Sequence, residues 1–497
     1  MMAAPGAVAA PAMPLSQLLA WPGCAGGDIP ISGLQLDSRK VRRGDLFLAV
    51  PGDVHDGRQF IEQAVANGAA AVLAEAPVAG FVDALPVPLL ELPELHLEVG
   101  PLAARFYHHP SRDLHMIGVT GTNGKTTTSR LVAQLGRLLG HSYGVIGTLG
   151  ATLDDAVSAA ANTTPDPVSL QQQLAQWRDQ GVHAVGMEVS SHALVQGRVN
   201  GVEFATAVFT NLSHDHLDYH GSMDAYGRAK LGLFASAGLR HAVVNLDDGF
   251  CSEVIAATAA GVQVLTYSGS GAAADVRVSD PCFTGQGVDA QLHTPWGSGR
   301  FSSPLPGEFN LANLAAAVTA VVLAGEELAA VLEAIAGLRP VPGRMQVIPN
   351  GLGVQVIVDY AHTPDALEQV LAALKAHVSG DLVTVFGCGG DRDRSKRQVM
   401  GRVASRFSDR VILTSDNPRS EDPDAILADI ATGCSGACIL LPDRAQAIAR
   451  AIGEARPGDC VVIAGKGHED YQLIGDERRY FSDAEQARSA LARRAAS

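Results

Sequence analysis

The stretch that decides the fold is HMIGVTGTNGKTTTSRLVAQL, residues 115–135. It starts as a short apolar run, passes through a glycine-rich loop and continues with leucines at helical spacing. Glycines in such a loop let backbone N–H groups approach phosphate oxygens, Lys125 can neutralise charge on the β- and γ-phosphates, and Thr126 can ligate Mg²⁺. The pattern therefore predicts a P-loop between a buried strand of a parallel sheet and a helix.

The loop predicted to bind nucleotide phosphates consists of Gly121, Thr122, Asn123, Gly124, Lys125, Thr126 and Thr127. The general P-loop pattern has a glycine where this chain has Val119. An ordinary turn is the alternative interpretation. A P-loop is found in motors, switches, kinases and ligases, so other residues have to indicate the reaction.

Length and pattern divide the chain into three α/β regions, because 497 residues are too many for one hydrophobic core. Residues 1–105 alternate short apolar runs with turns and predict a small domain, and residues 106–338 carry the P-loop and further buried strands. In 339–497, strand-like runs alternate with helical stretches, which is typical of a doubly wound, Rossmann-like domain. A segment rich in Pro, Gly and Arg, 337–345, predicts a hinge between the last two.

Charge and cysteine content exclude several classes of partner. The formal net charge of −15 predicts a surface that repels nucleic acids and anionic membranes. The most apolar stretch, 311–325, is too short to span a bilayer, and no Lys or Arg precedes Arg39, unlike the start of a signal peptide. Seven scattered cysteines fit a reducing compartment. We expect a cytoplasmic monomer that binds neither nucleic acid nor membrane.

Three residues outside the P-loop could complete a metal-dependent site. Glu188 ends the apolar run AVGME, where its carboxylate would face the phosphates and could bind Mg²⁺; a solvent-exposed strand end is the alternative. His216, in the cluster NLSHDHLDYH at 211–220, could ligate a metal. Lys230 is by default a surface lysine, but a desolvated amine there would have a lowered pKa and could react with CO₂.

A series of motifs runs through the whole chain in a fixed order. They are LDSR (36–39), GDLF (44–47), GTNGKTT (121–127), NTTP (162–165), MEVSSHAL (187–194), NLSHDHLDYHG (211–221) followed by Lys230, FNLAN (309–313), VDYAHTPDAL (358–367) and GKGHEDYQ (465–472). Together they resemble the Mur ligases, a family of ATP-dependent amino-acid-adding enzymes with three domains. The resemblance covers nearly the whole chain, and this order of motifs is very specific.

The resemblance implies a particular reaction. The enzyme would add meso-2,6-diaminopimelate to the D-glutamate γ-carboxyl of UDP-N-acetylmuramoyl-L-alanyl-D-glutamate, a step in the synthesis of the peptidoglycan precursor. ATP would be the co-substrate and Mg²⁺ the cofactor. The γ-carboxylate would first become an acyl phosphate, which the amine of diaminopimelate would then attack.

The resemblance also implies roles for individual residues. Lys125, Glu188, His216 and Lys230 would be catalytic. The metal ligands would be Thr126, Glu188, His216 and Lys230 as its carbamate. ATP would contact the P-loop and Asn310, Arg344, Asp359, Tyr360 and His362. The UDP-linked substrate would contact Leu36, Ser38, Asp53, Val54, His55, Asn162, Thr163, Thr164, Ser190, Gln196 and Arg198. The amino acid would contact Arg392, Asp416, Asn417, Pro418, Arg419, Gly465 and Glu469.

The choice of amino acid depends on Asp416-Asn417-Pro418-Arg419, which resembles the signature of members that select diaminopimelate over L-lysine. Diaminopimelate has an additional carboxylate, and an arginine side chain can bind a carboxylate through two parallel hydrogen bonds. A simple turn is the alternative interpretation of these four residues. A lysine-adding Mur ligase and a folylpolyglutamate synthetase are the alternatives within the ligases, and a P-loop ATP-driven binding switch is the alternative from another class.

Overall fold

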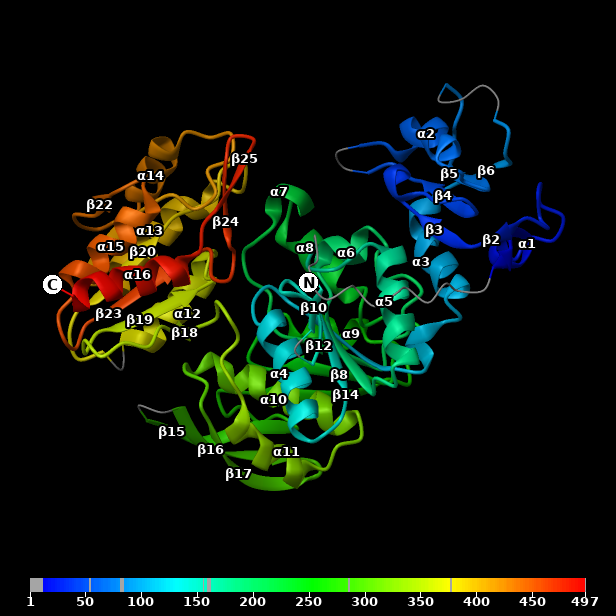
Figure 1. Ribbon diagram of the computed structural model, residues 1–497. Helices are drawn as coiled ribbons and strands as arrows, with labels where there is room; N and C mark the ends of the chain where they lie inside the picture. Colours follow the sequence, from blue (N-terminus) through cyan, green and yellow to red (C-terminus); the bar gives the residue numbers. More distant parts are fainter. Residues whose placement is uncertain are drawn as a thin grey trace.

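The structure is a computed structural model that describes residues 12–52, 55–80, 85–154, 156–158, 162–284, 287–375 and 378–496. It contains a four-stranded, an eleven-stranded and a six-stranded sheet, which follow one another along the chain and lie in three separate lobes (Figure 1). The predicted α/β class with three domains is confirmed. The boundaries at 105/106 and 338/339 stay predictions.

The N-terminal lobe is built on a parallel sheet with the strand order β3-β4-β5-β6. All five residues of β4 are buried, as expected for a strand covered on both faces. The last helix of the lobe, α3, packs on α5 of the central lobe. The elements are β1 (Met13–Pro14), α1 (Leu15–Leu19), β2 (Pro30–Ile31), β3 (Gly33–Gln35), η1 (Ser38–Lys40), β4 (Asp45–Ala49), η2 (Gly57–Phe60), α2 (Ile61–Ala66), β5 (Ala71–Glu75), β6 (Leu89–Leu92) and α3 (Leu95–Phe106).

The central lobe carries the predicted P-loop strand, β7, in the interior of its sheet. The strand order is β10-β9-β8-β11-β7-β12-β13-β14-β15-β16-β17. The middle of this order, β8-β11-β7-β12-β13-β14-β15, consists of parallel pairs. Antiparallel pairs extend the sheet at both ends, with β9 and β10 beyond β8 and with β16 and β17 beyond β15. The carboxyl ends of β7, β11 and β12 therefore meet at one edge, where ligands of parallel sheets bind.

The elements of the central lobe are η3 (Pro110–Arg112), β7 (His115–Thr120), α4 (Lys125–Leu138), β8 (Tyr143–Gly147), β9 (Gly150–Leu153), β10 (Ala156–Ser158), α5 (Pro167–Asp179), β11 (Ala184–Glu188), α6 (Ser191–Val195), β12 (Thr206–Phe209), α7 (Leu217–His220), α8 (Met223–Leu231), β13 (His241–Asn245), α9 (Cys251–Ala257), β14 (Gln263–Ser268), β15 (Val276–Thr284), β16 (Gly287–Thr294), β17 (Gly297–Ser303), α10 (Phe309–Leu323), α11 (Leu328–Ala334) and η4 (Ile335–Gly337).

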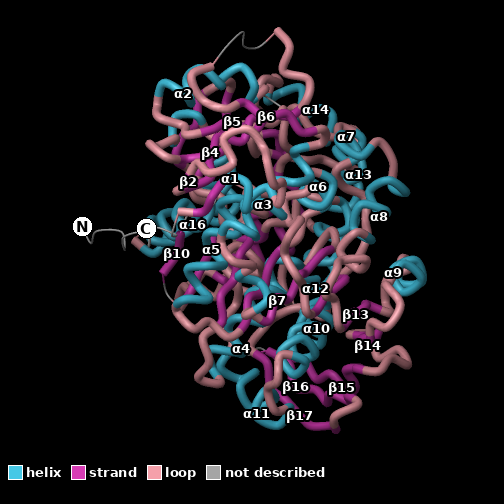
Figure 2. Tube along the Cα trace, turned by 90° about the vertical axis from the view of Figure 1, so that its right-hand side faces the viewer, coloured by secondary structure: helices cyan, strands magenta, loops and turns pink. Residues whose placement is uncertain are grey.

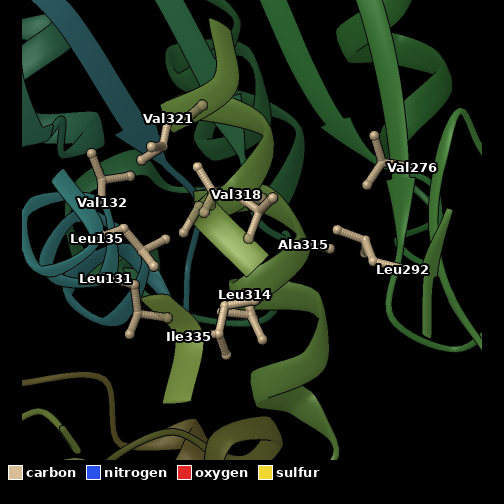
Figure 3. Close-up of a cluster of buried hydrophobic side chains, with 14 of the residues drawn as sticks. Leu131, Val132, Leu135, Val276, Leu292, Leu314, Ala315, Val318, Val321 and Ile335 are labelled. Atoms are coloured by element: carbon tan, nitrogen blue, oxygen red, sulfur yellow. The ribbon is translucent and has the colours of Figure 1, made fainter. Parts of the chain in front are cut away.

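Helix α10 organises the core of this lobe. It is apolar on nearly all sides, and its residues from Leu314 to Val321 are buried. Figure 3 shows α10 between α4, which contributes Leu131 and Leu135, and the antiparallel extension, which contributes Leu292. This packing fixes α4, and with it the loop that precedes α4.

The C-terminal lobe has the strand order β18-β19-β23-β20-β21-β22, parallel except for β18. The apolar runs predicted to be strands in this region form β19 to β23, so the Rossmann-like prediction agrees with the sheet. The elements are β18 (Gln346–Val347), β19 (Gln355–Asp359), α12 (Pro364–Lys375), β20 (Leu382–Phe386), α13 (Ser395–Phe407), β21 (Arg410–Leu413), α14 (Pro423–Ala431), β22 (Ile439–Leu440), α15 (Arg444–Glu454), β23 (Cys460–Ala464), β24 (Tyr471–Ile474), β25 (Glu477–Tyr480) and α16 (Asp483–Ala495).

The connection between the central and C-terminal lobes is anchored at both ends. The backbone N–H and carbonyl of Arg339 form hydrogen bonds of 2.9 and 3.1 Å with the side-chain amide of Gln134 on α4. A Cβ atom on Gly343 would lie 2.2 Å from the backbone nitrogen of His468, so Gly343 packs directly against the C-terminal lobe. Only residues 340–342 lie between the two anchors.

Figure 2 shows the antiparallel strands β15, β16 and β17 at one end of the long direction of the molecule, with α2 of the N-terminal lobe and α14 of the C-terminal lobe toward the other end. In the described part of the chain, every helix is too short or too polar to cross a bilayer.

Candidate active site

The loop after β7 has the geometry of a phosphate-binding loop. Gly121 and Gly124 both have positive φ angles, 147° and 84°, and a Cβ atom on Gly121 would lie 1.9 Å from Thr210 Oγ1. Lys125 begins α4, and its Nζ donates to the carbonyls of Gly121 and Thr122 at 2.8 and 2.9 Å. Removal from water lowers the pKa of Lys125. The loop thus places a cation and a helix N-terminus together, which suits a polyphosphate.

Glu188 lies at the end of β11 beside this loop and is only 2% exposed. Its carboxylate accepts hydrogen bonds of 2.9 Å from the hydroxyls of Thr126 and Thr148 and from the backbone N–H of Thr148. All three donors are neutral, so the buried negative charge lacks a counter-ion among its hydrogen-bond partners. The alternative of a solvent-exposed strand end is wrong.

His216 lies across the same cavity at the start of α7, with a φ of 55°. Its Nε2 is 3.4 Å from Asp215 Oδ2. Partial burial lowers the pKa of the His216 imidazole, which keeps a nitrogen lone pair available for a ligand.

The donor set near Glu188 fits Mg²⁺ rather than a metal held entirely by the protein. Among the described residues, no group of three or more His, Cys, Asp or Glu side chains is arranged so that it could hold a metal ion by itself. Mg²⁺ usually keeps several waters and binds through one or two carboxylates together with substrate phosphates. Glu188 and the Thr126 hydroxyl, placed beside a phosphate-binding loop, match that requirement.

Lys230 lies inside the protein on α8 and is 1% exposed, so the surface-lysine alternative is wrong. Its Nζ donates to the Gly121 carbonyl at 2.8 Å and lies 4.1 Å from the centre of the Tyr226 ring. Burial, followed by the charge of Lys125, lowers the pKa of Lys230 well below its ordinary value. A lowered pKa increases the fraction of the amine that is neutral and therefore nucleophilic.

A cavity of about 720 Å³ joins these residues to the C-terminal lobe. Arg344 stacks over the Tyr360 ring at 4.3 Å and donates to Thr126 Oγ1 at 3.3 Å. The carboxylate of Asp359 accepts from the backbone N–H groups of Met345 and Ala361 at 2.6 and 2.7 Å, which fixes the end of the connection between the lobes. The predicted ATP contacts that line the cavity are Thr122, Asn123, Gly124, Lys125, Thr126, Thr127, Asn310, Arg344, Asp359, Tyr360 and His362.

The residues predicted to bind the amino acid form a second cluster at the carboxyl ends of β20, β21 and β23. Glu469 Oε2 accepts from Asn417 Nδ2 at 2.9 Å, and Arg419 Nη1 donates to the Gly390 carbonyl at 2.8 Å. A Cβ atom on Gly465 would lie 2.6 Å from Asp416 Oδ2, so Gly465 allows this carboxylate to approach. Arg392 is exposed next to these groups, and Pro418 is buried.

The residues predicted to bind the UDP-linked substrate lie in two lobes. In the central lobe, Thr164 Oγ1 donates to the Glu188 carbonyl at 2.9 Å, and Arg198 Nη1 donates to the Thr164 carbonyl at 3.1 Å. Thr163, Ser190 and Gln196 lie in the same region; Asn162 is exposed. Leu36, Ser38 and His55 belong to the N-terminal lobe. Asp53 and Val54 lie outside the described residues.

Three family models match the chain: Mur ligase family, catalytic domain, at residues 30–107; Mur ligase middle domain, at 119–321; and Mur ligase, glutamate ligase domain, at 343–467. A protein named UDP-N-acetylmuramoyl-L-alanyl-D-glutamate--2,6-diaminopimelate ligase, from Ectopseudomonas mendocina (strain ymp), is 52% identical over 97% of this chain and 98% of its own length. The chain belongs to the Mur ligase family.

Two further relatives of this Mur ligase carry the same name. The protein from Pseudomonas aeruginosa is 50% identical over 94% of this chain and 96% of its own length. A solved structure with that name is 40% identical, has a TM-score of 0.71 and covers 97% of this chain and 99% of its own.

Several residues at the site of this Mur ligase were missed by the sequence analysis. Asp215, 7% exposed, lies 3.4 Å from His216 and 3.8 Å from His362. Asp365 accepts from Asn123 Nδ2 at 2.9 Å and so connects the C-terminal lobe to the P-loop. Lys466 is fully buried, and its Nζ lies 3.0 Å from both Asn417 Oδ1 and Glu469 Oε2.

The sequence did carry a signal for two of these residues. Asp215 lies within the histidine-rich cluster, and Lys466 stands between two glycines directly after an apolar run. A lysine at the carboxyl end of a buried strand is a candidate for a ligand-binding edge. Asp365 lies within the motif VDYAHTPDAL, but its contact with Asn123 depends on how two lobes meet, which the surrounding residues could not indicate.

Proposed function

We propose that this Mur ligase adds meso-2,6-diaminopimelate to the γ-carboxyl of D-glutamate in UDP-N-acetylmuramoyl-L-alanyl-D-glutamate, as a monomer in the cytoplasm. The chain is an ATP-dependent ligase, and relatives with this named activity are about half identical over nearly its full length. The observation that carries the proposal is the second cluster, which places Arg419, Asn417 and Glu469 together in the C-terminal lobe.

The chemistry requires activation, because joining a carboxylate to an amine in water is unfavourable and carboxylate oxygen is a poor leaving group. In the proposed first step, the γ-carboxylate attacks the γ-phosphate of ATP, which gives an acyl phosphate and ADP. Lys125 and the N–H groups of the P-loop neutralise charge on the transferring phosphoryl oxygens. The position of Lys125 at the first turn of α4 supports this role.

Glu188, Thr126, His216 and the carbamate of Lys230 would hold the divalent cation. Mg²⁺ supplies positive charge to the phosphate oxygens when bound. Lys230 would react with CO₂ through its neutral Nζ, and the buried position of this amine supports the modification.

In the proposed second step, the amine of diaminopimelate attacks the acyl carbon, and the tetrahedral intermediate collapses to the amide and phosphate. Arg392 and Arg419 would bind the distal carboxylate, because guanidinium groups match the geometry of carboxylates. Asp416, Asn417, Gly465 and Glu469 would orient the rest of the molecule. Closure of the cavity would keep water away from the acyl phosphate.

The UDP-linked substrate would extend from the N-terminal lobe to the central lobe. We propose contacts with Leu36, Ser38 and the 53–55 turn at one end. At the other end, the contacts would be Asn162, Thr163, Thr164, Ser190, Gln196 and Arg198. The bond between Thr164 and the backbone of Glu188 supports this proposal, because an acceptor bound at Thr164 would lie beside the proposed phosphate-transfer site.

Measurement of ADP release tests the proposal. ADP should form only when the UDP-linked dipeptide is present, and amide product should require meso-diaminopimelate. L-Lysine should react at least about 100-fold less efficiently, the scale of one unpaired buried charge in a binding site. A preference for L-lysine or for a folate with glutamate would contradict the substrate assignment. ATP turnover without any acceptor would favour the binding-switch alternative.

A further inference from the structure

Two loops carry the arginines of the second cluster. The first, residues 389–394, follows β20 and contains Arg392; the second, residues 416–421, follows β21 and contains Arg419. The loops touch closely: a Cβ atom on Gly390 would lie 1.9 Å from the Pro418 carbonyl, and the N–H of Gly390 donates to the Asn417 carbonyl at 2.9 Å. The relative position of the two guanidinium groups therefore depends on how these loops are fastened.

Each loop has a strained residue at or beside its arginine. Asp391 and Arg419 both have a φ of 52°, a left-handed conformation that costs energy for most residues other than glycine, less for an aspartate than for an arginine. Such a conformation persists only where the surroundings impose it. At Arg419, the hairpin of β24 and β25 does so, because the Arg419 N–H donates to the Leu473 carbonyl at 3.0 Å and its carbonyl accepts from the Gly475 N–H at 2.7 Å.

At Asp391, the second loop imposes the conformation. Glu421 Oε1 accepts from the Asp391 N–H at 2.7 Å, and the Asp391 carboxylate accepts from the Ser420 hydroxyl at 2.7 and 2.9 Å. Glu421 is itself held by Arg397, whose guanidinium is 1% exposed and donates to both Glu421 oxygens at 2.8 and 3.0 Å. Hydrogen bonds from Arg397 hold the pKa of Glu421 down to about 2, so Glu421 is ionised at any working pH.

We propose that Glu421, anchored by Arg397, is a positioning residue that fastens the two loops and so sets the spacing of Arg392 and Arg419 for the distal carboxylate of the amino acid. This inference rests on the proposed function. It assigns selectivity to a residue that touches no substrate. Arg392 and Arg419 repel each other, which means that their approach must be imposed by neutral or anionic neighbours. Glu421 is an anion of the second loop that contacts the first loop twice, through the Asp391 N–H and through Arg394 at 2.7 Å, and it is the one of the two connecting carboxylates that Arg397 holds in place.

The test uses the full-length protein with Glu421→Gln, which keeps the shape of the side chain but removes its charge. Asp429→Asn is the matched control: Asp429 Oδ2 also accepts from Arg397 Nη1, at 2.9 Å, but its side chain is 52% exposed and lies on α14 outside both loops. Both variants weaken the hydrogen bonding of Arg397. Only Glu421→Gln weakens the hydrogen bond to the Asp391 N–H.

Hydrogen exchange tests whether Glu421 fastens the two loops. Steady-state kinetics test whether this fastening affects the binding of diaminopimelate. In Glu421→Gln, the Asp391 amide should exchange at least about tenfold faster without any substrate, as expected for the loss of one charge-assisted hydrogen bond. The KM for diaminopimelate should rise about tenfold, with kcat and the KM values for ATP and the UDP-linked dipeptide nearly unchanged. Asp429→Asn should change neither readout.

The outcomes are distinguishable. If the wild-type enzyme prefers another amino acid, the proposed function fails, while the exchange of the Asp391 amide still decides whether Glu421 fastens the loops. Unchanged exchange in Glu421→Gln overturns the inference, as does a parallel rise of all three KM values. If Glu421→Gln does not fold, Glu421→Asp takes its place, because it keeps the charge but its shorter side chain draws the carboxylate back from the Asp391 N–H. That variant should raise the KM for diaminopimelate alone, and no rise would overturn the inference.

Discussion

At the scale of the residue, Lys230 gives the sharpest prediction. Its amine is buried beside the Gly121 carbonyl, within reach of the charge of Lys125. Lys230→Ala should lower kcat at least about 100-fold, the scale of one lost electrostatic contact in a transition state. A short carboxylic acid in solution should restore part of the rate if the missing group is a carbamate. Steady-state kinetics with and without added acetate measure both effects.

Lys375→Ala serves as the control, because Lys375 is 41% exposed and pairs with Asp409 on the surface. Its removal should leave the rate unchanged, with or without acetate. If Lys230→Ala loses activity and acetate fails to restore any of it, the lysine acts as an amine and the carbamate assignment is wrong.

The sequence was sufficient to predict the position of some site residues but not of others. Glu188 could be placed, because a carboxylate that ends an apolar run must lie at the edge of a buried strand. Lys230 could not be placed from its surroundings in the chain, since its burial comes from Tyr226 on its own helix together with a loop 109 residues away. Only the resemblance to a family singled it out.

At the scale of the element, the start of α4 is fixed by both conformation and packing. Gly124 has a φ of 84°, and a Cβ atom there would lie 2.5 Å from Asn313 Oδ1 on α10. Gly124→Ala should therefore weaken ATP binding and destabilise the protein by clearly more than the roughly 1–2 kcal/mol of a left-handed alanine. Isothermal titration with an ATP analogue and thermal unfolding provide the measurements.

Gly140→Ala isolates the conformational part of this effect. Gly140 follows α4 with a φ of 87°, but a Cβ atom there would meet nothing within 4 Å. This variant should lose about 1 kcal/mol of stability and retain the affinity for nucleotide. Equal losses in both variants would mean that the contact with Asn313 is unimportant.

The parallel strands were predicted better than the antiparallel strands, and the difference has a physical reason. The parallel strands of the C-terminal lobe are continuous apolar runs, so their positions could be read from the chain. The antiparallel strands β15 to β17 were missed because only alternate residues are buried, such as Val276 and Val278 or Val288, Ala290 and Leu292. That period-two signal is weaker than an apolar run, although it is present in the sequence.

At the scale of the whole molecule, the hinge expected within residues 337–345 stays a prediction, and the contacts of this segment limit where it could bend. Gly343 and Met345 are fastened to the C-terminal lobe, and Arg339 is fastened to α4, so a pivot would lie at residues 340–342. Its sequence is Pro-Val-Pro. The sequence could not show this, because both anchors are contacts with residues far away along the chain. Two prolines restrict the backbone there and limit the directions in which the lobes can move.

This restriction leads to a prediction about how tightly ATP cleavage is coupled to amide formation. If the pivot guides closure over the acyl phosphate, replacing Pro340 and Pro342 together by glycine should let the lobes open before the amine attacks, so that water hydrolyses the intermediate. The ratio of ADP to amide product should rise from about one toward two or more, with a smaller change in the rate of ADP release.

Both prolines are exposed, so their replacement creates no cavity in a hydrophobic core. Pro457→Gly is the control, because Pro457 is an exposed loop proline of the C-terminal lobe away from the pivot. This variant should keep the ratio of ADP to amide product at one. An unchanged ratio in the double variant would mean that the contacts across the cavity, such as that of Asn123 with Asp365, hold the closed form without help from the pivot.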